Sequence, residues 1–344
     1  MRPFLRLSQS ALRRSQTLNP SITPTRTPPT TFSAKRLGQV NRHFNMASTN
    51  SSENNNDSFK LSTVFNVEKK VALVTGGGSG IGLMVTQALA VNGAKVYIVG
   101  RTKEKLDTVV KTYSQGISGQ IIPVVADVSK KDDIAKLYQE ISSKEDHLDI
   151  LCNNAGISTK TFKHEASTAE EMKKNLFDNE DATFEDWNDV YRTNVSQIYF
   201  MTTCFLPLLQ KATEKTYGWS GMVLNISSMS GEVKTMQHHP QYNASKAATI
   251  HLTKMLANEI QNNGLKIRVN SIAPGVFPSE MTAGESGANQ KSHVEKEKYE
   301  SKTSAQRPGN DKDMAGAVLF VVTNQYLNGK TVTVDGGYEL VAGT

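Results

Sequence analysis

A tyrosine and a lysine stand four residues apart in Tyr242-Asn-Ala-Ser-Lys246. On a helix this spacing places both side chains on one face. A phenol with a pKa of about 10 is a poor acid or base at neutral pH, whereas a neighbouring ammonium group lowers that pKa by stabilising the phenolate. The pair is therefore a candidate for general acid/base catalysis, although Tyr/Lys pairs at this spacing are also common on helix surfaces.

A serine precedes this pair, where the predicted strand 221–226 ends. Ser228 follows Asn225-Ile-Ser, and a hydroxyl at the carboxyl end of a strand can hydrogen-bond a carbonyl oxygen in the adjoining crevice. Ser227 is the alternative, and an ordinary turn serine is the non-catalytic interpretation. With Tyr242 and Lys246, this serine would complete a site that reduces a carbonyl group.

Strand and helix patterns alternate from Lys70 onward, and they must position these side chains. Short apolar runs predict strands at 71–75, 95–99, 121–125, 148–152, 221–226, 267–272 and 331–334. Amphipathic segments between them predict helices, including 83–92, 132–142, 241–262, 314–322 and a long helix over 184–209 that is interrupted near its end at Pro207. Because parallel strands need such crossovers, the pattern predicts an α/β fold: a single Rossmann-type, doubly wound parallel sheet with helices on both faces.

A glycine-rich turn follows the first predicted strand. Gly76, Gly80 and Gly82 give G-x-x-x-G-x-G between a strand and a helix. In this position backbone N–H groups and the helix N-terminus meet a dinucleotide pyrophosphate, and glycine lets the backbone approach closely. A glycine cluster alone is also compatible with an ordinary loop, but the strand-turn-helix context predicts nucleotide binding.

The end of the second strand bears on the choice of cofactor. The sequence there reads Val99-Gly-Arg-Thr-Lys103, without an acid until Glu104. An acid would hold the ribose 2′-hydroxyl of NAD, whereas Arg101 can bind the 2′-phosphate of NADP, so NADP(H) is favoured over NAD(H). Asp127, after the third strand, is expected to accept a hydrogen bond from the adenine amino group or to cap the following helix.

Taken in order, these residues resemble the short-chain dehydrogenase/reductase family. The resemblance spans Lys69 to Gly337 and is carried by Thr75-Gly-Gly-Gly-Ser-Gly-Ile-Gly82, Asn153-Asn-Ala-Gly156, Asn194, Ser228, Tyr242-x-x-x-Lys246 and Pro274-Gly275. It implies that Tyr242 donates the proton, that Lys246 tunes its pKa and binds the ribose, that Ser228 holds the carbonyl, and that Asn194 supports a proton-relay water. It further implies that Asn154 lies near the cofactor and that Ser279 stands where a threonine usually binds the nicotinamide amide.

Two sets of candidate residues follow. The catalytic set is Asn194, Ser228, Tyr242 and Lys246. The cofactor set is Gly76, Ser79, Gly80, Ile81, Gly82, Arg101, Asp127, Val128, Asn154, Tyr242, Lys246, Pro274, Gly275, Val276, Phe277 and Ser279. The resemblance also implies a homodimer or homotetramer that packs through the two long helices near 186–209 and 242–262.

The segments Ala273-Pro-Gly-Val-Phe-Pro-Ser-Glu-Met-Thr282 and Asp335-Gly-Gly-Tyr338 resemble a narrower subgroup, the rhamnolipid-biosynthesis type of 3-oxoacyl-(acyl-carrier-protein) reductases. This implies an acyl-thioester substrate. A small ketone, sugar or polyol is the alternative substrate, and a non-catalytic NADP-binding protein is the remote alternative. The chain departs from the usual pattern in a polar stretch at about 164–181, which would be a lid or a solvated insertion, and in a long charged substrate loop at 283–303.

Composition and charge exclude several other functions. His238 and His239 are adjacent and have no acidic or thiol partner at ligand spacing, so no metal site is expected. No apolar run is long enough for a membrane span. The net charge of +6 comes from eight Arg and Lys residues among the first 45, which contain no Asp or Glu. The remainder is close to neutral, which argues against a nucleic-acid-binding face.

Three regions are expected along the chain. Residues 1–45 are Arg-rich, Ser/Thr-rich and free of acids, which is typical of a mitochondrial transit peptide and would direct the protein to the matrix. The alternatives are a disordered tail or translation from Met46, which would leave the protein in the cytoplasm. Residues 46–66 are expected to be a polar linker, and 67–344 the NADP-binding reductase domain.

Overall fold

The computed structural model describes residues 55–344, which form one compact unit. The leader predicted over residues 1–45 lies outside the described residues. Within the predicted linker, the chain forms a 3₁₀ turn (Asn55–Phe59) and a short helix, α1 (Leu61–Val64). Phe59 and Leu61 in these elements are largely exposed.

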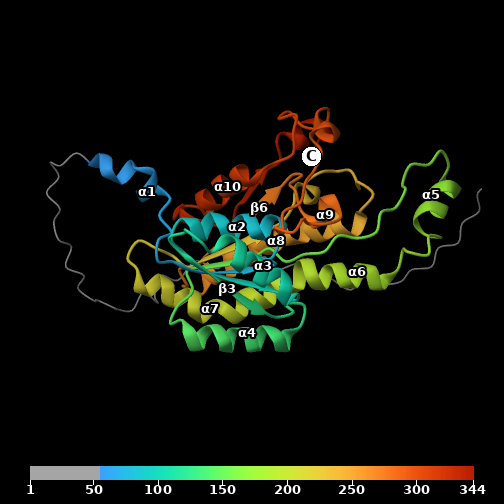
Figure 1. Ribbon diagram of the computed structural model, residues 1–344. Coiled ribbons are helices and arrows are strands. Elements are labelled where there is room, and N and C mark those ends of the chain that lie inside the picture. The colour runs from blue at the N-terminus through green and yellow to red at the C-terminus, as the bar shows by residue number, and fades with distance from the viewer. Residues whose placement is uncertain (1–54) are drawn as a thin grey trace, which may run out of the picture. The chain divides into compact units, whose positions relative to one another are not determined.

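The described residues contain a seven-stranded parallel sheet with the order β3-β2-β1-β4-β5-β6-β7 (Figure 1). The strands are β1 (Val71–Thr75), β2 (Lys95–Gly100), β3 (Gln120–Val125), β4 (Ile150–Asn153), β5 (Met222–Ile226), β6 (Arg268–Pro274) and β7 (Thr331–Val334). Each predicted strand is found, and the doubly wound α/β fold is confirmed.

Alternation of side chains along each strand divides the core into two layers. In β1, Ala72 and Val74 join one buried cluster, and Val71 and Leu73 join the other. Because successive side chains of a strand point to opposite faces, a strand that is apolar at every position must be covered on both sides. The continuous apolar runs in the sequence therefore require helices on both faces of the sheet.

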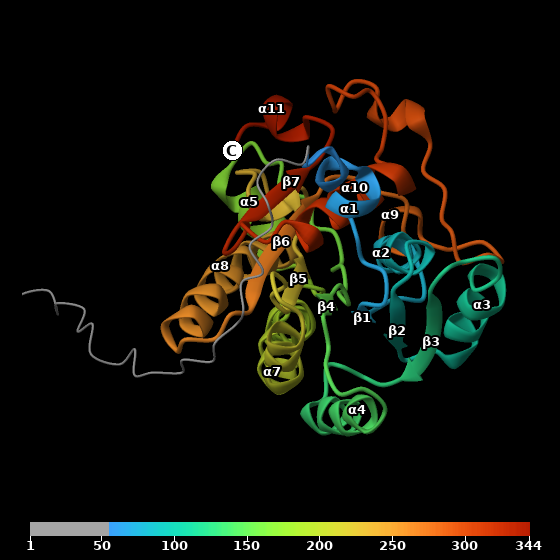
Figure 2. The ribbon, with the colours of Figure 1, turned by 90° about the vertical axis from the view of Figure 1, so that its left-hand side faces the viewer.

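Helices cover both faces of the sheet (Figure 2). The first cluster includes residues of α2 (Gly80–Val91), α3 (Lys103–Tyr113) and α10 (Asp311–Thr323). The second includes residues of α4 (Lys131–Lys144), α7 (Gln197–Lys215) and α8 (Pro240–Asn262). Each helix turns its apolar side to the sheet, and the helices supply the crossovers that parallel strands require.

The long helix predicted over 184–209 is present but differs in two ways. It begins as α6 (Phe184–Tyr191), continues through a π-helical turn (Arg192–Ser196) and runs on as α7 to Lys215. The expectation of a break at Pro207 is wrong, since α7 continues past it. Leu208, Leu209 and Ala212 are buried after the proline, and their packing compensates for the hydrogen bond that proline cannot make.

The polar stretch at 164–181 contains a helix that the sequence did not indicate, α5 (Ala169–Leu176). Thr168 caps it by accepting a hydrogen bond from the Glu171 N–H, and none of its residues is buried. In Figure 1, α5 lies apart from the helices that cover the sheet. The remaining short elements are a 3₁₀ turn (Met229–Gly231), α9 (Glu280–Ala283), a 3₁₀ turn (Lys296–Tyr299) and α11 (Tyr338–Ala342).

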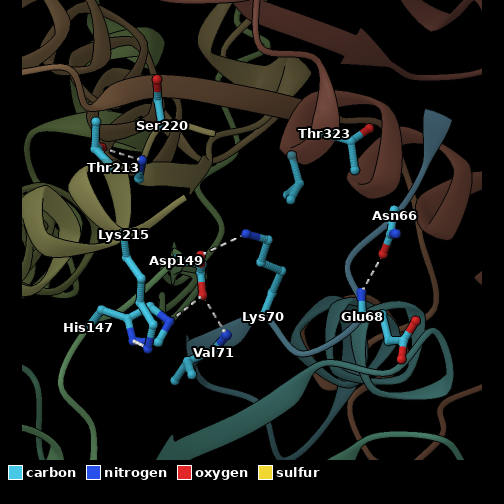
Figure 3. A network of polar contacts seen from close by, with 12 residues as sticks. Asn66, Glu68, Lys70, Val71, His147, Asp149, Thr213, Lys215, Ser220 and Thr323 are labelled. Carbon is cyan, nitrogen blue, oxygen red and sulfur yellow. Dashed lines mark hydrogen bonds and ion pairs between the residues drawn. The ribbon is translucent and has the colours of Figure 1, made fainter. Parts of the chain in front are cut away.

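A buried carboxylate ties β1 to β4 at the amino edge of the sheet (Figure 3). Asp149, fully buried just before β4, accepts a hydrogen bond from the Val71 N–H at 2.9 Å and pairs with Lys70 Nζ at 3.2 Å. His147 Nε2 lies 3.2 Å from the same carboxylate. The network fixes where both central strands begin, and so where their carboxyl ends lie.

Among residues 55–344, no helix has both the length and the apolar character needed to cross a membrane.

Candidate active site

The cleft that carries the predicted residues lies at the carboxyl ends of the strands. β1 pairs with β2 on one side and with β4 on the other, so the chain changes direction across the sheet at this point. Open α/β sheets bind ligands at such a switch point. Residues that follow β1 to β6 line a cleft of about 350 Å³, within the roughly 300–1,000 Å³ common for ligand sites.

The tyrosine and the lysine enter this cleft from the start of α8. Pro240 occupies the first turn of the helix, so Tyr242 and Lys246 lie in its first two turns on one face. Both line the cleft, and Lys246 Nζ lies 5.5 Å from the centre of the Tyr242 ring. Lys246 is buried and donates a hydrogen bond to the Ile226 carbonyl at 3.0 Å. The end of β5 therefore holds the lysine in place.

Burial dominates the acid/base properties of the pair. Burial lowers the pKa of Lys246 to about 8. The Tyr242 residue is half-buried, with its ring facing the cleft, and burial of its hydroxyl end raises the pKa of Tyr242. A hydrogen bond with Ser228 acts in the opposite direction. The lowering of the tyrosine pKa expected from the sequence is not found, because desolvation of the phenolate outweighs that hydrogen bond.

Two serines follow β5, and their contacts distinguish them. Ser227 donates to the Ile272 carbonyl at 2.9 Å and accepts a hydrogen bond from Ser271 Oγ at 2.7 Å. Ser228 Oγ accepts from the Ser230 N–H at 3.1 Å and faces Tyr242 in the cleft. The hydroxyl proton of Ser228 can therefore be donated to a ligand or to Tyr242. The structure places Ser228 in the catalytic cluster, whereas the Ser227 hydroxyl is hydrogen-bonded to β6.

Asn194 lies beside the cluster but does not line the cleft. It sits in the π-helical turn, where its side chain accepts from the Ile157 N–H at 2.8 Å and donates to the Ile157 carbonyl at 3.0 Å. Its amide also donates to Ser245 Oγ, and its own carbonyl accepts from Thr249 Oγ1. Because these groups are already engaged, Asn194 holds the segment after β4 against α8. Its support of a proton-relay water stays a prediction.

The turn after β1 can admit a pyrophosphate. Gly76 has a φ of +66°, and a Cβ there would lie 2.8 Å from Asn154 Nδ2. A Cβ on Gly82 would lie 2.1 Å from the Gly76 carbonyl oxygen. Asn154 closes the turn by donating to the Thr75 and Gly76 carbonyls. Only glycine fits at these two positions, so backbone atoms of the turn are exposed to the cleft without covering side chains. Gly82 itself is not among the residues that line the cleft.

Basic side chains gather at the far end of the cleft. Arg101 lines it directly after β2 and is exposed. Lys105, one helical turn further on, pairs with Glu280 of α9 across the cleft, and the hydrogen bond from Lys105 lowers the pKa of Glu280. Lys105 was not singled out in the sequence, although its place in the first turn of the helix after β2 could have indicated it.

Asp127 and Val128 line the cleft after β3. Asp127 accepts from both the N–H and the hydroxyl of Ser129, whereas α4 begins later, at Lys131. Burial would raise the pKa of Asp127, but the Ser129 hydrogen bonds, together with Lys130 and Arg101, outweigh it and lower the pKa. Asp127 caps a turn rather than the helix, and it carries a negative charge.

The segment after β6 closes the cleft. Pro274, Gly275, Phe277 and Ser279 line it, and Ser279 caps α9. Val276 does not line it, and the Val276 carbonyl accepts a hydrogen bond from the Gly309 N–H at 2.9 Å. The remaining predicted residues Ser79, Gly80, Ile81 and Asn154 are all in the lining.

The chain is similar to known proteins in sequence and in fold. The family model described as short chain dehydrogenase matches residues 70–290. The short-chain dehydrogenase/reductase PhomF' of Diaporthe leptostromiformis is 37% identical over 279 residues, which cover 80% of this chain and 92% of that protein. The rhamnolipids biosynthesis 3-oxoacyl-(acyl-carrier-protein) reductase of Pseudomonas aeruginosa is 32% identical, over 80% of this chain and 98% of that protein.

A solved structure gives the same match. The Pseudomonas aeruginosa RhlG/NADP active-site complex superposes with a TM-score of 0.65 at 30% identity, covering 80% of this chain and 98% of the other.

Proposed function

The chain belongs to the short-chain dehydrogenase/reductase family, and from this premise we propose that it is an NADPH-dependent reductase of 3-oxoacyl thioesters. One observation carries the proposal. Tyr242, Lys246 and Ser228 converge at the carboxyl edge of the sheet, in the same cleft as the glycine turn after β1. The family membership establishes an oxidoreductase acting on a CH–OH or carbonyl group. The cofactor and the substrate are the proposed parts.

The residues of the cleft can perform a carbonyl reduction. Bound NADPH would supply a hydride to the carbonyl carbon. Tyr242 gives its phenolic proton to the carbonyl oxygen as the C–O double bond becomes single, and Ser228 donates a hydrogen bond to the same oxygen. Lys246, held by the Ile226 carbonyl, stabilises the phenolate that remains. A raised pKa keeps Tyr242 protonated, as a proton donor must be before reaction.

Two arguments support NADP(H) rather than NAD(H). Arg101 lines the cleft directly after β2 and is exposed, so its positive charge is available for a 2′-phosphate, whereas Lys105 is paired with Glu280. The RhlG structure, at 30% identity, is described as an NADP complex.

The acyl-thioester substrate is supported by two relatives. One is the rhamnolipids biosynthesis reductase, and the other is the 3-oxoacyl-(acyl-carrier-protein) reductase FabG of Thermotoga maritima, which is 30% identical over 273 residues. We expect substrate choice to depend on the segments 164–181 and 283–303, where the sequence departs from the usual family pattern.

The decisive experiment follows NADPH oxidation by purified protein with acetoacetyl thioesters, simple ketones and sugars. We expect turnover of the thioester, and a fall in kcat of about 10²- to 10⁴-fold in Tyr242→Phe with NADPH binding retained. The exposed Tyr326 provides the matched control, Tyr326→Phe, which should keep full activity.

Faster turnover of ketones or sugars than of the thioester would contradict the proposed substrate class. Undiminished activity of Tyr242→Phe would overturn the mechanism. Tight NADPH binding without any turnover would indicate a non-catalytic protein.

We further propose a homodimer or homotetramer that packs through α7 and α8, and import into the mitochondrial matrix. The assembly is supported by Tyr199 and Met255, large apolar side chains that are 48% and 51% exposed on these helices.

The proposed import is supported by the Arg-rich, acid-free composition of residues 1–45. Cell fractionation with determination of the mature N-terminus tests the import, and a cytoplasmic protein that starts at Met46 would contradict it.

A further inference from the structure

Three potential metal ligands meet where the segment between β4 and α6 contacts the loop before α8. His164 and Glu165 come from this segment, and His238 comes from the loop that leads into α8. One ligand atom from each residue lies within 4.8 Å of the other two. Along the sequence His238 has only His239 beside it, and no metal site is expected from that spacing. The tertiary structure supplies the partners that sequence spacing could not show.

The distances suit a small divalent cation. Glu165 Oε1 lies 3.5 Å from His238 Nε2 and 3.8 Å from His164 Nε2. In a tetrahedral zinc site with bonds of about 2.1 Å, neighbouring ligand atoms lie about 3.4 Å apart. Small rotations of these partly exposed side chains would therefore complete the geometry. Two imidazoles and one carboxylate, with water in the fourth position, form a ligand set that zinc commonly uses.

His238 is already oriented as a ligand. Its Nδ1 lies 3.1 Å from the Phe162 carbonyl oxygen, and since a carbonyl only accepts, the hydrogen is on Nδ1. In this tautomer the lone pair is on Nε2, the atom that faces Glu165. A hydrogen bond of this kind, from the far nitrogen to a backbone carbonyl, is how metal-bound histidines are usually held.

The backbone around the cluster is fixed at some conformational cost. Gln237 and His238 are non-glycine residues with φ of 49° and 63°, in the left-handed region. The Phe162 N–H donates to the His238 carbonyl at 2.8 Å, and Asn175 of α5 donates to the Glu165 carbonyl at 3.1 Å. Both chain segments are thus held so that the three side chains face one another.

The two imidazole rings lie close together, with their centres 4.5 Å apart. His164 Nδ1 is buried and has no hydrogen-bond partner among the described residues. A ring nitrogen of His164 therefore remains without a protein partner at the place where the three ligands meet.

We propose that His164, Glu165 and His238 bind one Zn²⁺ ion, or a divalent cation of similar ligand preference, and that this ion joins the β4–α6 segment to the loop before α8. The three residues are not part of the lining of the cleft that holds Tyr242, so the ion is a clamp between two segments and not a reactant. His239, next to the cluster, lies 6.5 Å ring to ring from Tyr242, so the clamp fixes the chain directly before the proton donor.

The test is Zn²⁺ binding by the full chain after EDTA treatment, measured by titration calorimetry. Unaltered protein should bind one Zn²⁺ per chain, and Zn²⁺ should raise its Tm. Glu165→Gln, at an exposed site, and His238→Asn should each weaken binding at least tenfold. Asparagine tolerates positive φ, so His238→Asn keeps the loop conformation. His251 is exposed on α8, and the control His251→Asn should bind Zn²⁺ as the unaltered protein does.

Each variant is first checked for NADPH affinity without metal, which should match that of the unaltered protein. Two results would overturn the proposal: no Zn²⁺ binding by the unaltered chain, or equal affinity in Glu165→Gln, His238→Asn and the unaltered protein. Because the NADPH check does not involve Zn²⁺, failure of the metal site leaves the proposed reductase activity untouched.

Discussion

At the scale of single residues, the activity proposed here depends on removing two groups from water. Burial lowers the pKa of Lys246 to about 8 and raises the pKa of Tyr242. Both shifts favour the neutral form, as expected when the charged form is desolvated. A proton donor benefits from this environment, because the phenol stays protonated, while the lysine keeps its charge only at and below neutral pH.

The charge of Lys246 predicts the alkaline limb of the pH profile. The lysine is protonated below its lowered pKa and loses its charge as pH rises through about 8. Reductive kcat/KM should therefore fall roughly tenfold between pH 7 and pH 9. In Lys246→Arg, which stays charged, the limb should move to higher pH even if kcat is reduced. An unchanged limb in this variant would assign it to another group.

Arg101 predicts the cofactor preference. If it binds the 2′-phosphate, Arg101→Ala should raise the KM for NADPH by about 10- to 100-fold, the equivalent of about 1.5–3 kcal/mol for a charged hydrogen bond. The KM for NADH should change little. Lys103→Ala is the matched control, since Lys103 pairs with Asp107 on α3 and is not in the cleft lining. Equal losses for both cofactors would contradict the assignment.

At the scale of elements, the site depends on strands that end together, and the amino edge of the sheet sets where they start. Asp149 carries out this alignment from a fully buried position between β1 and β4. Asp146, in the same network, is largely exposed and pairs with Lys215. The two carboxylates differ in burial, so the same substitution should lower the free energy of unfolding by different amounts at the two positions.

We expect Asp149→Ala to lower the free energy of unfolding by about 3–5 kcal/mol, because Lys70 would keep a charge that is largely buried and unpaired, and the Val71 N–H would lose its acceptor. Asp146→Ala should lower the free energy of unfolding much less, since its ion pair is exposed to solvent and screened. Urea denaturation of both variants measures the difference. Similar costs would show that Asp149 does not position the strands.

At the scale of the whole molecule, the described unit leaves apolar side chains uncovered on the helices of one face. Tyr199 on α7 and Met255 on α8 are about half exposed. Val91, at the end of α2 on the opposite face, is exposed to a similar extent. If α7 and α8 form the subunit interface, these positions should respond differently to charge.

Met255→Glu should shift the protein toward the monomer, because an unpaired charge would be buried at the interface. The control Val91→Glu, on the other face, should leave the assembly unchanged. Light scattering coupled to size-exclusion chromatography measures both masses. A native mass that persists in Met255→Glu, also when combined with Tyr199→Glu, would exclude this interface.

The sequence by itself determined the parallel sheet and most of the cleft. Apolar runs such as Val71–Thr75 can form only doubly covered strands, and the order of the glycine turn, Ser228 and the Tyr242–Lys246 pair places them at one edge of such a sheet. These are local signals, each set by a few neighbouring residues. Periodicity also located α8, because its apolar positions face the sheet.

Only the tertiary structure decided which polar groups are engaged and which are free. The hydrogen bonds of Asn194 to Ile157, of Ser227 to β6 and of Lys105 to Glu280 join residues far apart in the sequence. The same holds for the meeting of His164 and Glu165 with His238. Such contacts and the burial that shifts the pKa of Tyr242 depend on distances across the folded chain, which spacing along the sequence does not contain.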